Sequence, residues 1–307
     1  MILNILFIVI GIVLVLWGAD RLTDGAVAVA EKMKMPQIVI GLTIVAMGTS
    51  MPEFCVSLIS ALKGTSDLAV GNIVGSNIFN TLLIVGVSAL VAPMSIMKTT
   101  VRKDIPFALV ASALLLIMCL DEDISRIDAA ILFVMFLIFM YITLRGAKAQ
   151  GTDLEEKEKK PMATWLSVVW ILVGLACLIG GSNLFVDGAT VVATKLGVSE
   201  AVIGLTIVAG GTSLPELATS VVSARKGNSG IAIGNVLGSN VFNILAILGL
   251  TGVISPMTLK GITMTDLSMM VISIILIWLF SFTKYKIERW EGAILTVVFV
   301  GYIYSLL

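Results

Sequence analysis

The chain has 307 residues, of which 58% are hydrophobic and only 13% charged, and its formal net charge is zero. With a mean hydropathy of +1.07 it is far more apolar than a water-soluble domain of this length, so the lipid bilayer is its expected environment and no nucleic-acid partner is expected. There is no histidine, and Cys55, Cys119 and Cys177 stand apart at no metal-ligand spacing, which argues against zinc, haem and di-iron chemistry and against a resident cofactor.

Apolar runs of the length that crosses roughly 30 Å of hydrocarbon recur along the chain with short polar breaks between them. The first run, from Ile2, has no basic residues before it and no cleavage site after it, so we interpret it as a span and not as a signal peptide. Arg21 to Met35 and its counterpart Asn183 to Val198 are interpreted as short amphipathic helices on the membrane surface. The ten predicted spans are 2–19, 36–62, 69–92, 105–120, 127–144, 163–181, 199–225, 231–254, 267–282 and 290–306.

Ten spans place alternate loops on opposite faces of the membrane, and the positive-inside rule then assigns the faces. Of the 20 Lys and Arg residues, all but Lys63, Arg126, Lys195 and Lys260 fall on one side. We therefore expect a multi-pass protein of the plasma (inner) membrane with both termini outside. The charged segment 145–162 becomes a cytoplasmic linker; a regulatory role for it stays open, although it contains no ligand spacing.

Two copies of one sequence pattern follow each other at a constant offset of 163 residues. The stretch Gly41 to Gly64 recurs as Gly204 to Gly227, and the alignment continues without gaps into the next span. The predicted units are a first five-helix repeat, residues 1–144 with its motif at 41–92, and a second, residues 163–307 with its motif at 204–255. Five spans are an odd number, so the second repeat runs through the membrane in the opposite sense, an organisation typical of secondary transporters with alternating access.

A proline interrupts the second and the seventh span in mid-membrane. Pro52 and Pro215 each lack the backbone N–H that continues a helix, so we expect a kink or break near 46–49 and 209–212, with main-chain carbonyls left free as ligands. A proline kink tolerated for packing is common in a single helix. The same break beside a carboxylate in both halves favours a functional site.

The strongest signal for a site is one carboxylate in each of these two spans, Glu53 and Glu216. A charged side chain at the centre of a span costs about 2.5–3.5 kcal/mol on insertion scales, so both must face the protein interior. Apart from Arg225, the last residue of its span, no basic residue lies in any predicted span to pair with them. A protonated glutamic acid bonded to backbone remains one interpretation; a divalent cation that neutralises both carboxylates is the favoured one.

The third and eighth spans supply further oxygen atoms, from Ser76 and Asn80 with their repeats Ser239 and Asn243. Their spacing of four puts each pair on one helix face, and we expect these four to bind the ion. The amides at 72 and 235 are expected to bond helices together instead. Carboxylates, hydroxyls and carbonyls without nitrogen or sulfur ligands suit calcium, and the same oxygens suit sodium, so mutually exclusive occupancy is a simple coupling mechanism.

The doubled motif Gly-Thr-Ser-x-Pro-Glu and Gly-Asn-x-x-Gly-Ser-Asn-x-x-Asn resembles the alpha repeats of the calcium/cation antiporter superfamily, and those of the prokaryotic sodium/calcium exchangers in particular. The resemblance covers essentially the whole chain. It implies an all-α polytopic membrane protein with two inverted five-helix halves, and exchange of calcium for sodium at a central cluster. The first and sixth helices, with Gly11, Gly18, Gly174, Gly180 and Gly181, would slide across the other eight.

The same resemblance assigns ligands position by position. Calcium would be bound by Glu53, Glu216 and the main-chain carbonyls of Thr49 and Thr212. Flanking sodium sites and the middle of the cluster would be built from the carbonyls of Ala46 and Ala209, from Ser50, Ser76, Ser213 and Ser239, and from Asn80 and Asn243. Potassium-dependent relatives carry Asp where Asn243 stands, which speaks against a potassium requirement and leaves only two carboxylates for the middle position. One chain contains both halves of this site, so a monomer suffices.

Three other functions remain open at this point. A calcium/proton antiporter would use the same two glutamates, and the sequence discriminates against it only through its serine and threonine oxygens. An intramembrane hydrolase could use paired carboxylates, but the chain lacks histidine and a serine–base pair, so we do not expect an enzyme. A passive cation channel would need no counter-ion.

Overall fold

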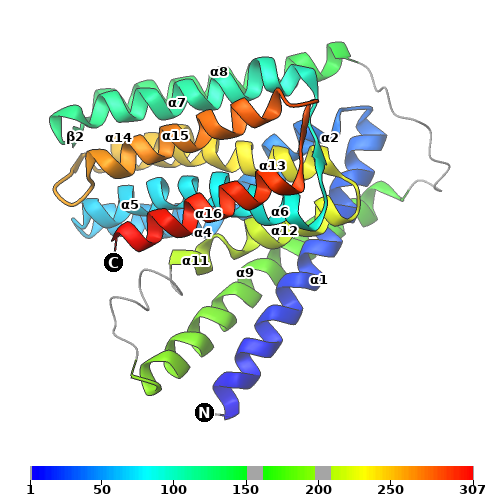
Figure 1. Cartoon of the computed structure of the whole chain (residues 1–307), viewed down its shortest axis with the longest axis horizontal. Coiled ribbons are helices and arrows are strands. Elements are labelled where there is room, and N and C mark those ends of the chain that lie inside the picture. Colours follow the sequence, from blue (N-terminus) through cyan, green and yellow to red (C-terminus); the bar gives the residue numbers. More distant parts are fainter. Residues whose placement is uncertain (1, 151–161, 198–208, 307) are drawn as a thin grey trace.

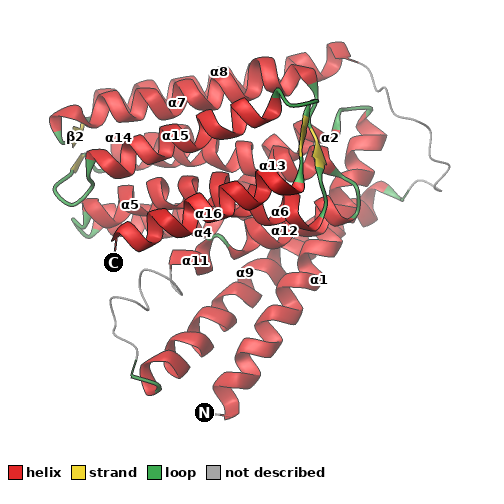
Figure 2. Cartoon of the chain, viewed as in Figure 1, coloured by secondary structure: helices red, strands yellow, loops and turns green. Residues whose placement is uncertain are grey.

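The protein is a bundle of helices with two very short pairs of strands (Figures 1 and 2). The computed structural model describes residues 2–150, 162–197 and 209–306. The first half contains α1 Ile2–Met33, α2 Gln37–Ile40, η1 Gly41–Val45, α3 Ala46–Thr49, α4 Met51–Leu62, α5 Ser66–Ile78, η2 Phe79–Ile84, α6 Val85–Val91, β1 Met94–Ser95, η3 Thr100–Asp104, α7 Ile105–Met118, η4 Cys119–Asp121, β2 Asp123–Ile124 and α8 Arg126–Gln150.

As far as the structure describes it, the second half repeats the order of the long helices and strands, without counterparts of η3 and η4. It contains α9 Thr164–Lys195, α11 Ala209–Thr212, α12 Leu214–Arg225, α13 Ser229–Val241, η6 Phe242–Leu248, α14 Gly249–Ile254, β3 Met257–Thr258, α15 Met264–Ser281, β4 Lys286–Ile287 and α16 Arg289–Leu306. The segments η1, η2, η3 and η6 are π-helical, a wider winding that occurs mostly as short insertions in α-helices, frequently at functional sites.

The two strand pairs mark opposite ends of the bundle. At one end β1 pairs antiparallel with β4, with Met94 opposite Ile287, and at the other β2 pairs antiparallel with β3, with Ile124 opposite Met257. We call these the β1–β4 end and the β2–β3 end. The turn after α12 leads into α13, which packs on β1, whereas the equivalent turn after α4 leads into α5, which packs on β3. Equivalent turns therefore lie at opposite ends, as an inverted repeat requires.

Eight spans can be recognised by length and composition alone within the described residues. Seven single helices are long and apolar enough, and the pair Gln37–Thr49 and Met51–Leu62, bent by 48°, makes an eighth. The other two predicted spans correspond to α11 with α12, whose preceding residues lie outside the described part of the chain, and to α16, an 18-residue helix. The chain is thus an all-helical, multi-pass membrane protein with two repeat halves.

The predicted amphipathic helices are wrong as separate elements. α1 continues as one 32-residue helix from Ile2 to Met33, and α9 likewise continues to Lys195. The charges at Asp20, Arg21 and Asp24 that appeared to end the first span are paired with one another and with Lys226, directly after α12, so they do not interrupt the helix.

α1 and α9 lie side by side along their length, and in Figure 1 they run diagonally to the rest of the bundle. Glycines make this approach possible. A Cβ on Gly18 would lie 2.8 Å from the Gly174 carbonyl oxygen, and one on Gly11 would lie 2.7 Å from the Gly181 oxygen. Gly180, which the sequence grouped with these, has nothing within 4 Å of its Cβ position and plays no part in this contact.

The centre of the bundle is formed by α5–η2–α6 and α13–η6–α14. Every residue from Ile231 to Val241 is buried. Large apolar side chains point outward from the peripheral helices instead, for example Val13, Val134 and Val297, which are 59%, 53% and 69% exposed. This arrangement suits a lipid environment, with the polar residues of the repeat motif enclosed between the central helices.

Candidate functional site

The predicted helix breaks lie directly beside the two glutamates. Ser50 leaves helical geometry with φ −81° and ψ 9°, between the end of α3 and the start of α4, and Ser213 does the same with φ −91° and ψ 6°. Pro52 and Pro215 then occupy the first turn of the new helix, where the missing N–H costs nothing. The break therefore lies one residue beyond the predicted 46–49 and 209–212.

Each break places its glutamate in the first turn of a helix. Glu53 in α4 and Glu216 in α12 are each only 1% exposed. The unpaired N–H groups and the dipole of a helix N-terminus favour negative charge at this position. The two carboxylates lie close enough for their charges to interact, and neither forms an ion pair with any Lys or Arg of the described residues.

Serines bond the carboxylate of the opposite half. The Ser213 hydroxyl donates to Glu53 Oε1 at 3.0 Å, and the Ser50 hydroxyl donates to Glu216 Oε1 at 2.9 Å. Ser76 Oγ lies 3.3 Å from Ser213 Oγ. In the second half, Ser239 Oγ lies 3.5 Å from Glu216 Oε1. The four serines predicted from the sequence therefore converge on the two glutamates.

The remaining predicted ligands from the broken spans are placed less completely. The Thr49 hydroxyl donates to Asn235 Oδ1 at 3.1 Å and lies 3.3 Å from the Ala46 carbonyl oxygen. Thr212 lies beside Glu53. Ala209 opens α11, and nothing beyond its backbone is described.

The predicted packing amides do hold helices together. Asn72 Nδ2 donates to the Glu53 carbonyl at 3.2 Å and to Ser57 Oγ at 3.0 Å. Its repeat equivalent, Asn235, makes the same pair of bonds, at the same lengths, to the Glu216 carbonyl and Ser220 Oγ. These bonds fix each glutamate's helix against the central helix of its own half.

Four buried oxygen atoms around the two glutamates have no hydrogen-bond donor among the described residues: Glu53 Oε2, Glu216 Oε2, Asn80 Oδ1 and Asn243 Oδ1. They belong to two repeat-related pairs. The elements that carry them meet, since α4 packs on η6 and α12 packs on η2. Buried acceptors left without a donor are costly, and a bound cation is one kind of partner that satisfies oxygens of this type.

The chemistry of these four oxygens limits which metal ions would suit them. Carboxylates and amide carbonyls are hard oxygen ligands, suited to calcium or sodium and poorly suited to zinc or copper. In the described part of the chain, no three His, Cys, Asp or Glu side chains are arranged to hold a metal ion. The set around the two glutamates contains only two carboxylates, and its other oxygens come from neutral groups.

A cavity of about 500 Å3 leads toward this set from the β2–β3 end. It begins among Ile262, Asp266 and Tyr302 and reaches Asn72 and Ser76. Ser76 in turn contacts Ser213, which bonds Glu53, so the cavity adjoins the serines of the site. Sequence analysis had not identified Ile262, Asp266 or Tyr302 as functional residues.

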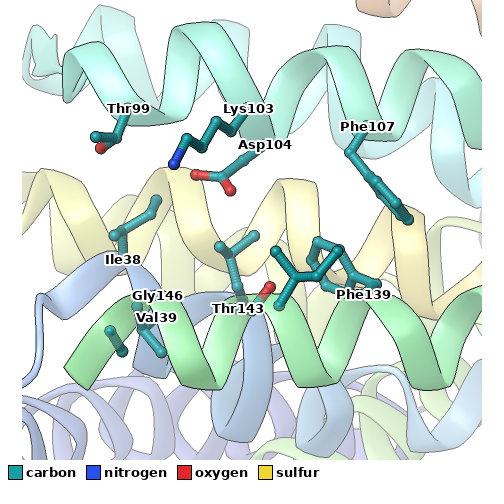
Figure 3. Close-up of a pocket in the computed structure, with 12 residues that line it drawn as sticks. Ile38, Val39, Thr99, Lys103, Asp104, Phe107, Phe139, Thr143 and Gly146 are labelled. Atoms are coloured by element: carbon teal, nitrogen blue, oxygen red, sulfur yellow. The ribbon is translucent and has the colours of Figure 1, made fainter. Parts of the chain in front are cut away.

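A second cavity, of about 280 Å3, lies between α2, η3, α7 and α8 (Figure 3). Its lining includes Lys103, Asp104 and Thr143 among apolar side chains, and none of the predicted site residues. It is separate from the glutamate cluster.

Comparison with known proteins agrees with this arrangement. The profile of the Sodium/calcium exchanger protein family matches residues 3–145 and 166–307, which is both halves. The chain belongs to this family. It is therefore a cation antiporter and not an enzyme.

Several known proteins are similar to this chain over most or all of its length. CaxA of Alkalimonas amylolytica is 39% identical, and the match covers 100% of this chain and 99% of that protein. The sodium/calcium exchanger MaX1 of Methanosarcina acetivorans is 32% identical, over 98% and 97%. The inner membrane protein YrbG of Escherichia coli is 37% identical, over 83% and 81%.

Among solved structures, the sodium-calcium exchanger NCX_Mj soaked with Na+ and Ca2+ superimposes with a TM-score of 0.88 at 30% identity, covering 100% of this chain and 99% of that one. The exchanger-family fold of the chain is thereby established. Which of the family's ions it carries depends on the site residues themselves.

Proposed function

We propose that this exchanger-family protein exchanges calcium for sodium at the glutamate cluster. The observation that carries the proposal is the set of four orphaned buried oxygens, two of them carboxylate and two of them amide. Two carboxylates give a formal charge of about minus two, which one calcium ion neutralises. The alternative load is a small number of sodium ions, and the two loads exclude each other because two carboxylates balance only about two positive charges.

The ligands are assigned as the sequence predicted. Calcium is bound by Glu53 and Glu216 with the main-chain carbonyls of Thr49 and Thr212. Sodium is bound at flanking positions by the carbonyls of Ala46 and Ala209 and by Ser50, Ser76, Ser213 and Ser239, with Asn80 and Asn243 between them. The convergence of the serines on the carboxylates supports this assignment, because a hydroxyl that donates to a carboxylate keeps its oxygen lone pairs for a cation.

We also propose that transport needs no potassium, because Asn243 provides a neutral amide where potassium-dependent relatives carry Asp. The two halves, 1–144 and 163–307, form one site within a single chain, so a monomer is sufficient.

The excess of Lys and Arg on one face orients both termini outside and the linker 145–162 in the cytoplasm. In this orientation the β2–β3 end faces outward.

The test is calcium uptake by purified protein in liposomes. Radioactive calcium uptake is measured under an outward sodium gradient, under an outward proton gradient without sodium, and for a Glu53→Gln variant under both. We expect uptake that requires sodium and is lost in the variant. Uptake driven by protons alone would assign a calcium/proton antiporter, and entry that needs no counter-ion gradient would assign a channel.

A further inference from the structure

Four asparagines at the centre of the bundle form two crossed pairs between the halves. Asn80 Nδ2 donates to Asn240 Oδ1 at 3.1 Å, and Asn243 Nδ2 donates to Asn77 Oδ1 at 3.0 Å. All four side chains are buried. Asn80 and Asn243 are proposed ligands, whereas the side-chain oxygens of Asn77 and Asn240 accept these bonds.

The orientation of the first pair follows from a hydroxyl. Thr81 Oγ1 lies 2.6 Å from the main-chain carbonyl oxygen of Asn77, to which it can only donate. Its oxygen is then the acceptor for Asn240, whose Nδ2 lies 2.7 Å away. Because its nitrogen donates to Thr81, Asn240 presents its side-chain oxygen to Asn80. Asn80 must therefore donate to that oxygen through its own Nδ2.

The orientation of the second pair follows from a main-chain carbonyl. Asn77 Nδ2 faces the carbonyl oxygen of Asn240 at 3.3 Å and the sulfur of Met270 at 3.9 Å, and neither atom can donate. Asn77 therefore presents its oxygen to Asn243. In both pairs the ligand residue is left with a free carbonyl oxygen, which is the orphaned Oδ1 described above.

We propose that Asn77, Asn240 and Thr81 are positioning residues that set the calcium affinity of the site by fixing which end of the Asn80 and Asn243 amides is free to face the ion. A flipped amide would offer N–H groups to a cation. The inference rests on the proposed calcium site. The hydroxyl exists in one half only, because the repeat equivalent of Thr81 is Ile244, so the Asn80 side depends on a single side chain.

Thr81 offers a matched pair of variants. Thr81→Val keeps the shape and removes the hydroxyl, whereas Thr81→Ser keeps the hydroxyl. Calcium binding to purified protein is titrated calorimetrically without sodium. We expect Thr81→Val to weaken calcium binding by about 2- to 10-fold, the value of one lost hydrogen bond, and Thr81→Ser to stay within about 2-fold.

A structural role for Thr81 is separated by repeating the comparison in an Asn80→Ala background. With no amide left to orient at position 80, Thr81→Val should then change calcium affinity by less than about 2-fold. Equal effects in both backgrounds, or equal affinities of the valine and serine variants, would overturn the inference while leaving the calcium site intact. A parent protein that binds no calcium would overturn the proposed function and this inference together.

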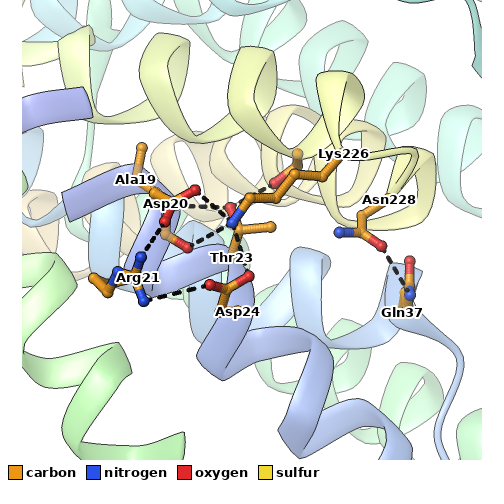
Figure 4. A network of polar contacts seen from close by, with 9 residues as sticks. Ala19, Asp20, Arg21, Thr23, Asp24, Gln37, Lys226 and Asn228 are labelled. Carbon is orange, nitrogen blue, oxygen red and sulfur yellow. Dashed lines mark hydrogen bonds and ion pairs between the residues drawn. The ribbon is translucent and has the colours of Figure 1, made fainter. Parts of the chain in front are cut away.

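An independent feature lies at the β1–β4 end, where Lys226, directly after α12, is bound to α1 (Figure 4). Lys226 Nζ lies 2.6 Å from Asp20 Oδ1 and 2.7 Å from Asp24 Oδ1. Next to it, the buried hydroxyls of Thr23 and Ser223 are 2.9 Å apart. These contacts close α1 against the end of α12.

The repeat places the same two charges at the opposite end. Shifted by 163 residues, Lys226 and Asp24 correspond to Lys63 and Asp187. Both are exposed, and within the described part of the chain neither forms an ion pair. Asp20 corresponds to Asn183, so the second arrangement would have only one carboxylate.

We infer that these are two alternating latches: Lys226 with Asp24 closes the β1–β4 end in the state seen here, and Lys63 with Asp187 closes the β2–β3 end in the opposite state. In an inverted repeat the two states arise when the halves exchange conformations, so a contact made at one end passes to its equivalent at the other. The cavity that reaches Ser76 from the β2–β3 end agrees with that end being the open one.

The latches are tested with Lys226→Gln and Lys63→Gln, measuring the calcium concentration for half-maximal uptake from each face in right-side-out and inside-out membrane vesicles. Partly exposed ion pairs are modest, so shifts of about 2- to 5-fold are expected. Lys226→Gln should raise the half-maximal concentration at the β2–β3 face and lower it at the other. Lys63→Gln should do the reverse, less strongly, and the double variant should return toward the parent values.

Lys260→Gln removes the same charge at the β2–β3 end without a latch partner and serves as the control. Exchanging the charges, Asp24→Lys with Lys226→Asp, should return the half-maximal calcium concentrations at both faces toward the parent values, which either single change shifts. Shifts in the same direction for both lysine variants, or shifts matched by Lys260→Gln, would overturn the latch.

Discussion

Replacing Ser213 by alanine should separate the sodium sites from the calcium site. Its hydroxyl donates to Glu53 Oε1 at 3.0 Å, and its oxygen is a proposed sodium ligand. A hydrogen bond to a charged group contributes about 1.5–3 kcal/mol, equivalent to roughly 10- to 150-fold in affinity. Ser76 Oγ lies only 3.3 Å from Ser213 Oγ and can replace part of the lost contact, so we expect the lower limit, a rise of about 10-fold in the sodium concentration that half-saturates uptake.

Calcium should be affected less, because it is bound directly by the carboxylates and keeps those ligands in the variant. The assay compares sodium-driven uptake with calcium/calcium exchange in the same liposomes, where we expect a change in calcium affinity below about 3-fold. Ser50→Ala should behave alike, since Ser50 bonds Glu216 at 2.9 Å. Ser112→Ala is the control: Ser112 is fully buried in α7, and its hydroxyl has no partner among the described residues. Equal losses for sodium and calcium, or a Ser112→Ala effect of the same size, would refute the reasoning.

Two further predictions concern stability. Gly174→Ala would place a Cβ 2.7 Å from a main-chain nitrogen of α1, so we expect a loss of about 1–3 kcal/mol, seen as a lower thermal unfolding temperature. Gly180→Ala, with nothing within 4 Å, should stay within about 0.5 kcal/mol, and similar losses for both would contradict the packing argument. Asp67→Ala removes the acceptor for the amides of Lys260 and Gly261, at 2.8 and 2.9 Å, and should speed limited proteolysis in the loop before α15; an unchanged cleavage rate would show that other contacts hold this loop.

Much of the site could be predicted because its parts are local in the sequence. The motif repeated at an offset of 163 identifies Glu53 and Glu216 as the unpaired charges of two apolar spans, and Pro52 and Pro215 locate the breaks to within a residue. The helix spacing of Ser76 and Asn80 places both on one face of the helix. These are consequences of composition and period, which do not depend on what lies opposite.

Helix ends near the membrane surface were harder to predict. Asp20, Arg21 and Asp24 appeared to end the first span, but α1 continues past them because they pair with one another and with Lys226. The lysine is 202 residues from Asp24, and no local pattern indicates such a partner.

The sequence by itself determined the membrane environment, the duplicated halves and the residue types of the candidate site. Only the tertiary structure decided which half serves which carboxylate: Ser50 bonds Glu216, and Ser213 bonds Glu53. It also decided that Asn80 pairs with Asn240 and Asn243 with Asn77, each across the two halves. The physical reason is that a repeat makes pairing within a half and pairing between halves equivalent in sequence. Only the packing of α12 on α3, of α13 on η2 and of α5 on η6 selects between them.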